Sequence, residues 1–243
     1  MSESIVIIPT YNEKENIEKI IQAVIHQEEP FHVLIVDDGS PDGTADIVKR
    51  LQGIHPEEIH LLERSSKQGL GTAYIAGFKY CLQKGYTYIF EMDADFSHNP
   101  LDLPRLLKAC RDEGGDFSIG SRYVRGGKVS NWSWDRIILS YGASWYVRLL
   151  TWMWIKDPTA GFICYTSKVL EAIDFDKIEF VGYAFQIEMK FAARQLGFKH
   201  KEVPITFSDR EEGVSKMNGG IISEAVIGVL KMCWRGITGF YRN

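Results

Sequence analysis

The sequence predicts an α/β fold in which helices cover both faces of a mostly parallel sheet. Short β-prone apolar runs alternate with amphipathic helical stretches through the first half of the chain. Their lengths match right-handed βαβ units, which build parallel sheets. Acidic residues recur where several apolar runs end. This pattern is expected when the carboxyl ends of parallel strands meet at one ligand-binding edge.

Five strands are expected in the first half, each a short apolar run followed by polar residues. They lie at 4–10, 32–40 with its closing turn, 59–64, 86–93 and 116–123. Helices are expected between them, beginning near 13, 44, 71 and 100. In the first of these, apolar residues fall at helical spacing at Ile17, Ile20, Ile21, Val24 and Ile25.

Residues at the helix ends support these boundaries. Thr44 is expected to cap the helix that follows it, because a threonine hydroxyl can accept from backbone N–H groups of the first turn. Asn99 and Pro100 occupy the positions expected for an N-cap and a first helical residue. Gly85 is expected to end the preceding helix.

The alternation weakens after Tyr123. A helical stretch is expected at about 133–155, a helix near 184–197, a strand at 200–207 and an apolar helix from about 220. No secondary structure is predicted for 160–173. Without a repeat or an obvious linker, the chain is interpreted as one domain, 1–243, divided into a βαβ part (1–123) and a C-terminal elaboration (124–243).

Composition excludes several classes of protein. With 243 residues and a net charge of −4, nothing global favours nucleic acid or an anionic membrane, so we expect no nucleic-acid partner. Four widely spaced cysteines, without a CxxC pair, argue against a disulfide framework and fit a reducing cytoplasm. The N-terminus has no secretory signal pattern, and Arg148 interrupts the most apolar segment, 137–155.

Asp93 and Asp95 follow the fourth predicted strand and, two residues apart, point to the same side of an extended chain. Asp37 and Asp38 end the second strand, and Glu13 follows the first. Each group alone could be ordinary turn chemistry. Together at one sheet edge they suit a hard divalent cation, Mg²⁺ or Mn²⁺, that bridges to a nucleotide diphosphate. Neither a GxGxxG motif after a strand nor a GxxxxGK[ST] motif is present, which disfavours nicotinamide and P-loop enzymes.

Four cations could meet anionic ligands. Arg122 closes the fifth strand and Arg136 begins the Trp-rich helical stretch. Arg210 and Lys216 lie in a loop after the last strand, which could be a lid that carries phosphate ligands. For any one of them, the alternative is a solvated surface charge.

Seven motifs in chain order identify a family resemblance that covers nearly the whole chain. They read IIPTYNEKENI, IVDDGSPDGT, GLGTAYIAGF, MDADFSHNP, IGSRY, GYAFQIEM and REEGVSK. The chain resembles the dolichol- or polyprenol-phosphate mannosyltransferases, which are metal-dependent inverting glycosyltransferases of family 2 with the GT-A fold. DADFSHNP, GSRY and the late RxxGxSK are the most specific to this branch.

The resemblance implies roles for individual residues. The nucleotide-sugar site would comprise Pro9, Tyr11, Glu13, Val36, Asp38, Asp93, Ala94, Asp95, Arg122, Arg210 and Lys216. Asp93 and Asp95 would bind the metal, and Asp95, Arg122, Arg210 and Lys216 would be catalytic. Arg122 and Arg136 would meet the acceptor phosphate. Ser97 stands where some relatives have a metal-binding Gln, so a third protein ligand is not assigned.

The implied reaction is transfer of mannose from GDP-mannose to a dolichyl or undecaprenyl phosphate. A phosphate acceptor is already largely dianionic at neutral pH and needs no general base. A family 2 enzyme with another donor, such as UDP-glucose, or with a glycan hydroxyl acceptor remains open, and Asp95, Asp135 or Glu188 could then act as the base. A nucleotide-sugar sensor without turnover is a third interpretation, and a sugar-1-phosphate nucleotidyltransferase is weaker still.

The two late helical stretches could meet the lipid. Trp and Tyr beside basic residues in 137–155 and after 220 suit a bilayer interface. The alternative is that both stretches pack on the sheet or on a second subunit. We therefore expect a cytoplasmic protein bound peripherally at the cytoplasmic face of a membrane.

Overall fold

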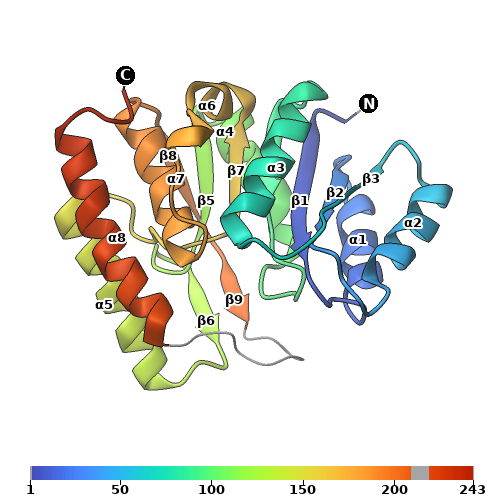
Figure 1. The fold of residues 1–243 in the computed structure, drawn as a ribbon, viewed down its shortest axis with the longest axis horizontal. Coiled ribbons are helices and arrows are strands. Elements are labelled where there is room, and N and C mark those ends of the chain that lie inside the picture. Colours follow the sequence, from blue (N-terminus) through green and yellow to red (C-terminus); the bar gives the residue numbers. More distant parts are fainter. Residues whose placement is uncertain (1, 209–218, 243) are drawn as a thin grey trace.

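The computed structural model describes residues 2–208 and 219–242, and within them one main sheet has seven strands in the order β3-β2-β1-β4-β7-β5-β8 (Figure 1). These are β1 (Ser4–Thr10), β2 (His32–Asp37), β3 (Ile59–Glu63), β4 (Tyr88–Glu91), β5 (Phe117–Ser121), β7 (Ile163–Thr166) and β8 (His200–Pro204). All pairs are parallel except those of β7, which runs antiparallel to both β4 and β5. The mostly parallel sheet is confirmed. Its antiparallel strand falls in 160–173, where no element was predicted.

The central strands are buried on both faces, as parallel strands between helix layers must be. Successive side chains of β1 point to opposite sides, so that Ile5 and Ile7 enter one hydrophobic core while Val6 and Ile8 enter the other. All four are fully buried. The apolar run that predicted a strand is therefore also what holds the two helix layers on the sheet.

Helices cover both faces, as predicted (Figure 1). α1 (Ile17–Ile25), α2 (Thr44–Ile54) and α4 (Leu103–Arg111) contribute to one core. α3 (Leu70–Gln83), α6 (Ser167–Ala172) and α7 (Tyr183–Gln195) contribute to the other. Two short 3₁₀ helices, η1 (Pro100–Asp102) and η2 (Phe175–Lys177), complete the helices of these layers.

The end signals had mixed outcomes. Asn99 caps η1, because its side-chain oxygen accepts from the Leu101 N–H at 3.1 Å, and Pro100 is the first helical residue. Gly85 lies just past the end of α3 with φ +79°, a left-handed conformation that glycine adopts without strain. The predicted cap at Thr44 is wrong: Gly43 precedes the helix and Thr44 is its first residue. The Thr44 hydroxyl instead donates to Asp42 and accepts from the backbone N–H of Glu13.

The second half extends the same sheet and adds a small layer of its own. The predicted strand at 200–207 is divided into β8 and β9 (Thr206–Ser208), with buried Ile205 between them. β9 pairs in parallel with β6 (Lys128–Ser130). The expected late helices are α5 (Trp134–Thr151) and α8 (Gly219–Ile237). They lie side by side on the flank of the molecule away from β1–β3 (Figure 1).

Candidate functional site

The loop after β4 carries the first two predicted site residues. Asp93 is held through its backbone, because its N–H donates to Nδ1 of His98 at 3.2 Å. His98 is almost fully buried and stacks on Phe162 at 4.9 Å. Burial lowers the pKa of His98 to about 4, so that the ring is neutral near pH 7 and its Nδ1 can accept. His98 thus serves as a hydrogen-bond acceptor within its own loop.

Asp95 is oriented by the turn that follows it. Its Oδ1 accepts from the backbone N–H of Ser97 at 3.1 Å and from the Ser97 hydroxyl. Phe96 between them has φ +58°, a left-handed conformation that is uncommon for a non-glycine residue and makes the turn tight. The Ser97 hydroxyl is thus directed at Asp95, and Ser97 acts on this site as a hydrogen-bond donor to a carboxylate.

The donor atoms of this loop fit a hard divalent cation. The Asp93 side chain is 36% exposed, whereas Ala94 between the two aspartates is buried. Two carboxylates on one short loop are the oxygen ligands that Mg²⁺ and Mn²⁺ prefer. In residues 2–208 and 219–242, no cluster of three or more His, Cys, Asp or Glu side chains could hold a metal ion. A cation here would therefore be bound by Asp93 and Asp95 together with oxygen atoms of a nucleotide-sugar ligand and of water.

The two aspartates at the end of β2 make structural hydrogen bonds that the sequence did not predict. Asp37 accepts from the hydroxyls of Thr10 (2.9 Å) and Ser40 (2.6 Å), which fixes the turn after β2 to the end of β1. Asp38 is 6% exposed and accepts from Nε of Arg64 at 2.6 Å. Both carboxylates therefore have structural partners, whether or not a ligand is bound.

The remaining nucleotide-site candidates cluster around the ends of β1 and β2. Pro9 and Val36 are paired across the two strands. Val36 is fully buried in the core, so its side chain does not face a ligand. Tyr11 follows β1, and Nζ of Lys67 lies 4.9 Å from the centre of its ring. The backbone N–H of Glu13 donates to Thr44. The fold thus brings these residues to the edge that also carries Asp93.

Arg122 directly follows β5 and is held by a residue that no sequence pattern singled out. Its Nε and Nη2 donate to the two carboxylate oxygens of Asp157 at 2.7 and 2.6 Å, and Nη2 also donates to the Thr159 hydroxyl at 2.8 Å. Asp157 is fully buried. Burial alone would raise the pKa of Asp157, but the charge and hydrogen bonds of Arg122 outweigh it and lower the pKa overall. Asp157 therefore remains ionised and fixes the guanidinium.

Aromatic rings surround the same guanidinium. The Cζ atom of Arg122 lies 5.2, 5.5 and 5.4 Å from the ring centres of Tyr123, Trp132 and Phe207. Arg136, in the first turns of α5, stands over the same indole of Trp132 at 4.1 Å. The two predicted acceptor-phosphate arginines thus share one ring, and neither Trp132 nor Phe207 was singled out from the sequence.

The residues predicted to bind the sugar donor and those predicted to bind the acceptor phosphate come close together at β9. The ring of Phe207 lies 5.5 Å from that of His98, which holds the backbone of Asp93. The backbone N–H of Ser208 donates to the carbonyl of Ser97 at 3.4 Å. Arg210 and Lys216 follow β9 in sequence, but they lie outside the described residues.

Two of the alternative base candidates are placed elsewhere. Glu188 is fully buried and accepts from the backbone N–H groups of Glu179 and Phe180 and from the Tyr241 hydroxyl. It thereby ties α7 to the chain on either side, which is a structural role. Asp135 is exposed in the first turn of α5. Only Asp95 of the three lies on the loop that fits a metal.

A buried polar cluster stands behind the metal-site loop. Nε2 of Gln186 donates to Glu91 at 2.5 Å, and Nζ of Lys190 donates to the carbonyls of Ala160 and Gln186, both at 2.7 Å. Glu91 and Lys190 are fully buried. Burial raises the pKa of Glu91 to about 8 and lowers that of Lys190 to about 7.

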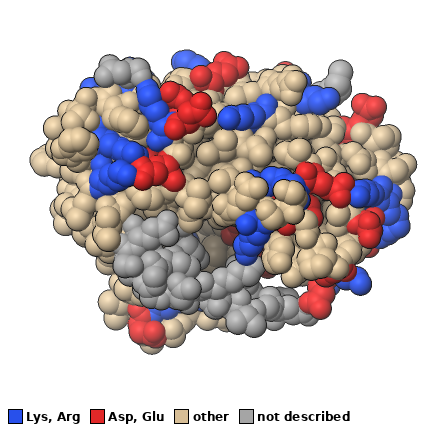
Figure 2. All heavy atoms as spheres, viewed as in Figure 1, with Lys and Arg blue, Asp and Glu red and all other residues tan. Residues whose placement is uncertain are grey.

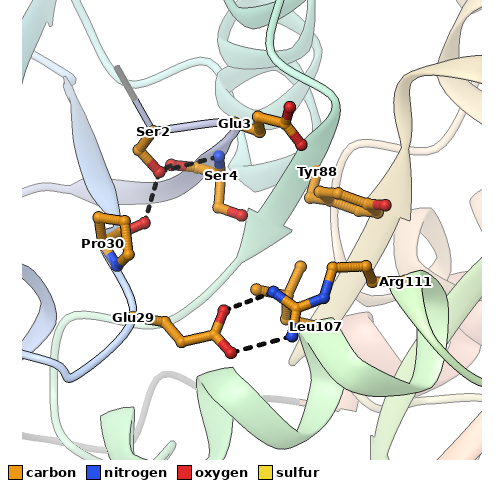
Figure 3. A pocket seen from close by; sticks show the side chains of 8 residues that line it. All are labelled: Ser2, Glu3, Ser4, Glu29, Pro30, Tyr88, Leu107 and Arg111. Carbon is orange, nitrogen blue, oxygen red and sulfur yellow. Dashed lines mark hydrogen bonds and ion pairs between the residues drawn. The ribbon is translucent and has the colours of Figure 1, made fainter.

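One cavity away from this edge has a cation that is already paired. A cavity of about 200 Å³ lies near the start of β1, between Ser2, Glu29, Tyr88 and Arg111 (Figure 3). Its cation is already neutralised, because Arg111 makes two hydrogen bonds to the Glu29 carboxylate. On the face in Figure 2, Lys and Arg alternate with Asp and Glu, without a broad field of one sign. Among the described residues, this face therefore presents no broad basic field to an anionic substrate.

Known proteins with a similar sequence are polyprenyl-phosphate mannosyltransferases. The chain is 49% identical to the polyprenol monophosphomannose synthase of Mycolicibacterium smegmatis, over 96% of this chain and 88% of that protein. It is 46% identical to the undecaprenyl-phosphate mannosyltransferase of Micrococcus luteus, over 95% and 96% of the two chains.

Solved structures with the same fold are more distant in sequence. Glucosyl-3-phosphoglycerate synthase of Mycobacterium tuberculosis, in complex with Mn²⁺, UDP and glucosyl-3-phosphoglycerate, superposes with a TM-score of 0.68 at 16% identity, over 95% of this chain and 80% of the other. A mannosyltransferase of Pyrobaculum calidifontis, in complex with GDP-mannose and Mn²⁺, gives 0.58 at 15%, over 97% and 74%. At this identity they establish the fold alone, and the GT-A-type expectation is confirmed. The family model for glycosyl transferase family 2 matches residues 5–173, and the chain belongs to that family.

Proposed function

We propose that this family 2 glycosyltransferase transfers mannose from GDP-mannose to a polyprenyl phosphate, which yields polyprenyl-phosphate mannose. The observation that carries the proposal is that Asp93, on the metal-site loop, is linked through His98 and Phe207 to Arg122. Carboxylates for a metal-bound donor and cations for an anionic acceptor thus share one sheet edge. The 49% identity to a polyprenol monophosphomannose synthase supports this substrate class.

The donor belongs to residues 1–123 in this proposal. Asp93 and Asp95 would hold Mg²⁺ or Mn²⁺, which when bound supplies neutralisation of the charge that develops on the departing diphosphate. Asp95 is kept in one orientation by Ser97, and His98 fixes the backbone of Asp93. The residues that would surround the nucleoside are Pro9, Tyr11, Glu13, Val36 and Asp38. Arg210 and Lys216 are assigned to the phosphates on the resemblance alone.

The acceptor belongs to residues 124–243 together with Arg122. A phosphate monoester with a second pKa near ~6 is largely dianionic at neutral pH and is itself the nucleophile. Its oxygen forms the new bond to the anomeric carbon while the bond from that carbon to the diphosphate oxygen breaks, and no proton has to be removed. Arg122 and Arg136 orient and screen this charge. The location of Glu188 inside the molecule removes one carboxylate that a hydroxyl acceptor would have used as a base.

The outer surfaces of α5 and α8 fit a membrane surface. An α5 stripe comprises Trp134, Ile138, Tyr141, Trp145 and Leu149, and an α8 stripe comprises Ile227, Leu230, Trp234 and Ile237; all are between 41% and 81% exposed. Each stripe repeats every three to four residues, so it follows one side of its helix. In α5 the buried residues Ser144, Val147 and Thr151 lie on the opposite, inner side of the helix.

We propose that the two stripes dock on the cytoplasmic face of a bilayer, where the lipid acceptor resides. Arg148 stands 4.5 Å from the ring centre of Trp145 and 5.8 Å from that of Trp154, a pairing suited to the headgroup region. Among the described residues, no helix has the length and apolar character needed to span a bilayer. Contact through an interfacial helix face accommodates both observations.

The reaction is tested by offering GDP-mannose and UDP-glucose, each radiolabelled in the sugar, with undecaprenyl phosphate or undecaprenol. Labelled lipid is expected only from GDP-mannose with the phosphate. Transfer from UDP-glucose, or to the free alcohol, would favour the alternative donor or hydroxyl acceptor. Binding of either donor without any lipid product would favour a sensor.

The docking is tested by sedimentation with phosphatidylcholine–phosphatidylglycerol vesicles. Ile227→Ser should weaken binding, whereas Leu101→Ser should not, although Leu101 on η1 is as exposed (69% against 66%). Equal effects of the two changes would contradict the docking surface. A stable dimer that does not bind vesicles would instead indicate that the stripes form a subunit interface.

A further inference from the structure

We propose that Trp132 and Phe207 are positioning residues, which together set where the acceptor-phosphate guanidiniums stand relative to the metal-site loop. Neither ring would touch the reacting atoms. The inference rests on the proposed function, because it gives these rings a task in the transfer of a sugar to a phosphate.

Trp132 supports both guanidiniums. Arg136 lies 4.1 Å and Arg122 lies 5.5 Å from the centre of its indole. A guanidinium over an indole is attracted to the negative face of the ring, more strongly where water is excluded. A single ring therefore counteracts part of the repulsion that two like charges experience when both must face one phosphate. Asp157 adds its charge at Arg122, through the paired hydrogen bonds at 2.7 and 2.6 Å.

The face of the Trp132 ring, and not its N–H group, makes the contacts described above. Nε1 of Trp132 is buried and has no hydrogen-bond partner among the residues that the structure describes. A buried donor without a partner is unfavourable. The feature that position 132 uses is consequently the face of the ring and not its N–H group. A phenyl ring, which has a face and no donor, should replace it in part, and an aliphatic side chain should not.

Phe207 connects this support to the donor side. Its ring centre lies 5.6 Å from that of Trp132, 5.4 Å from Cζ of Arg122 and 5.5 Å from the ring centre of His98. His98 in turn accepts from the backbone N–H of Asp93. Packed rings thus bridge the whole distance between the acceptor arginines and a metal-site aspartate.

The strand that carries Phe207 and the strand that precedes Trp132 reinforce the bridge. β6 and β9 pair in register, with Val129 opposite Phe207, and Ser208 reaches the carbonyl of Ser97 at 3.4 Å. The small sheet therefore links the backbone next to Trp132 to the metal-site loop. In this proposal the small sheet holds the donor site and the acceptor site at a fixed distance from each other.

The expected consequence is a loss in turnover and not in donor binding. In-line attack requires the reacting atoms at about 3–3.5 Å, and a misplacement of about 1 Å can cost 100-fold. Trp132→Leu and Phe207→Leu should therefore lower kcat by about 10- to 100-fold. The dissociation constant of GDP with Mn²⁺ should stay within about twofold of the wild-type value, because that ligand meets the other side of the bridge.

The experiment measures kcat and KM for undecaprenyl phosphate in detergent, and GDP–Mn²⁺ affinity by calorimetry, for both variants. Trp132→Phe should recover most of the turnover. Phe240→Leu is the matched control, because this ring also lies under an arginine, at 4.6 Å (Arg235), away from the site and outside both stripes. The control should keep kcat near that of the wild type.

The outcomes separate this inference from the proposed function. No labelled lipid from the wild-type chain would overturn the proposed function and its dependent inference together. A productive wild type with unchanged kcat in both leucine variants would overturn the inference alone. So would an equal loss in Trp132→Phe and Trp132→Leu, or a parallel loss of GDP–Mn²⁺ affinity in Phe207→Leu, because each would indicate general disruption. A folded state equal to wild type by near-ultraviolet circular dichroism is required of every variant.

Discussion

The metal-site loop and the acceptor cluster lie next to each other, yet they are built by different physical means. The loop, residues 93–98, is held by short-range hydrogen bonds: Ser97 to Asp95 and Asp93 to His98. The acceptor cluster is held by long-range contacts, in which Arg122 meets Asp157 35 positions later and shares rings with Trp132 and Phe207. A local loop tolerates changes elsewhere in the chain, whereas a cluster drawn from four segments depends on all of them.

The largest effect should come from removing a metal ligand. Asp93→Asn should lower transfer by at least about 100-fold, because the charge on the leaving diphosphate would lose its stabilisation. The unfolding midpoint should change little, since this side chain is 36% exposed. Transfer is measured as labelled lipid and stability as a urea melt. Near-normal turnover would remove Asp93 from the site.

Asp157 sharpens the contrast, because its loss should damage folding as well as activity. Asp157→Ala removes the buried carboxylate that pairs with Arg122, whose own side chain is 9% exposed. Breaking a buried ion pair in this way typically costs about 3–5 kcal/mol of unfolding free energy. Glu18→Ala, which breaks an exposed pair with Arg50 at 2.7 Å, is the control and should cost at most about 1 kcal/mol. Comparable losses in the two urea melts would contradict this account of Arg122.

Gly127 tests how tightly the chain is packed at the end of β5. A Cβ atom at this position would lie 2.6 Å from the carbonyl oxygens of Ser121 and Arg122. Gly127→Ala should therefore destabilise the fold by about 1–3 kcal/mol. Gly53→Ala, inside α2 where no atom lies within 4 Å, should stabilise it by about 0.5–1 kcal/mol. Two changes of the same sign in thermal melts would refute the steric argument.

The burial of His200 on β8 predicts that the free energy of unfolding depends on pH, with a smaller effect than the changes above. Burial lowers its pKa to about 4 in the folded chain, against about 6.5 in the unfolded chain. The contribution of the neutral ring is complete above pH 6.5 and is lost as the pH falls toward 4, because only the unfolded state then takes up the proton. His200→Phe should flatten the fall in unfolding free energy over that window by about 1–2 kcal/mol. Parallel curves for variant and wild type would exclude His200 as a source.

The difference between the two regions also explains which structural features could be predicted from the sequence. Strands β1, β2 and β4 and the Asp93–Asp95 loop were predictable, because their signals are local: apolar runs and carboxylates two residues apart. Asp157 gives no such signal, since its partner lies on a strand that folding brings beside it. β7 was missed because an antiparallel strand of four residues between two parallel ones has no period of its own.

The errors at β2 and α2 have one cause. Asp37 was interpreted as available for a ligand and Thr44 as a helix cap, each from its usual behaviour at such positions. Both side chains instead bond between segments: Asp37 to Thr10, and Thr44 to the backbone of Glu13. Propensity describes what a side chain does with its own neighbours, and tertiary contacts override it where two loops meet.

The central claim is that donor and acceptor are held by separate residues on one sheet edge, and parallel binding titrations test it most directly. GDP–Mn²⁺ affinity is measured by calorimetry for the wild type, Asp93→Asn and Arg136→Gln, beside KM for undecaprenyl phosphate in every active variant. Asp93→Asn should lose the Mn²⁺-dependent part of GDP binding. Arg136→Gln should keep that binding within about twofold and raise KM for the lipid phosphate at least about tenfold, in keeping with the loss of one charged contact. Loss of GDP–Mn²⁺ binding in Arg136→Gln, or an unchanged KM, would contradict the separation.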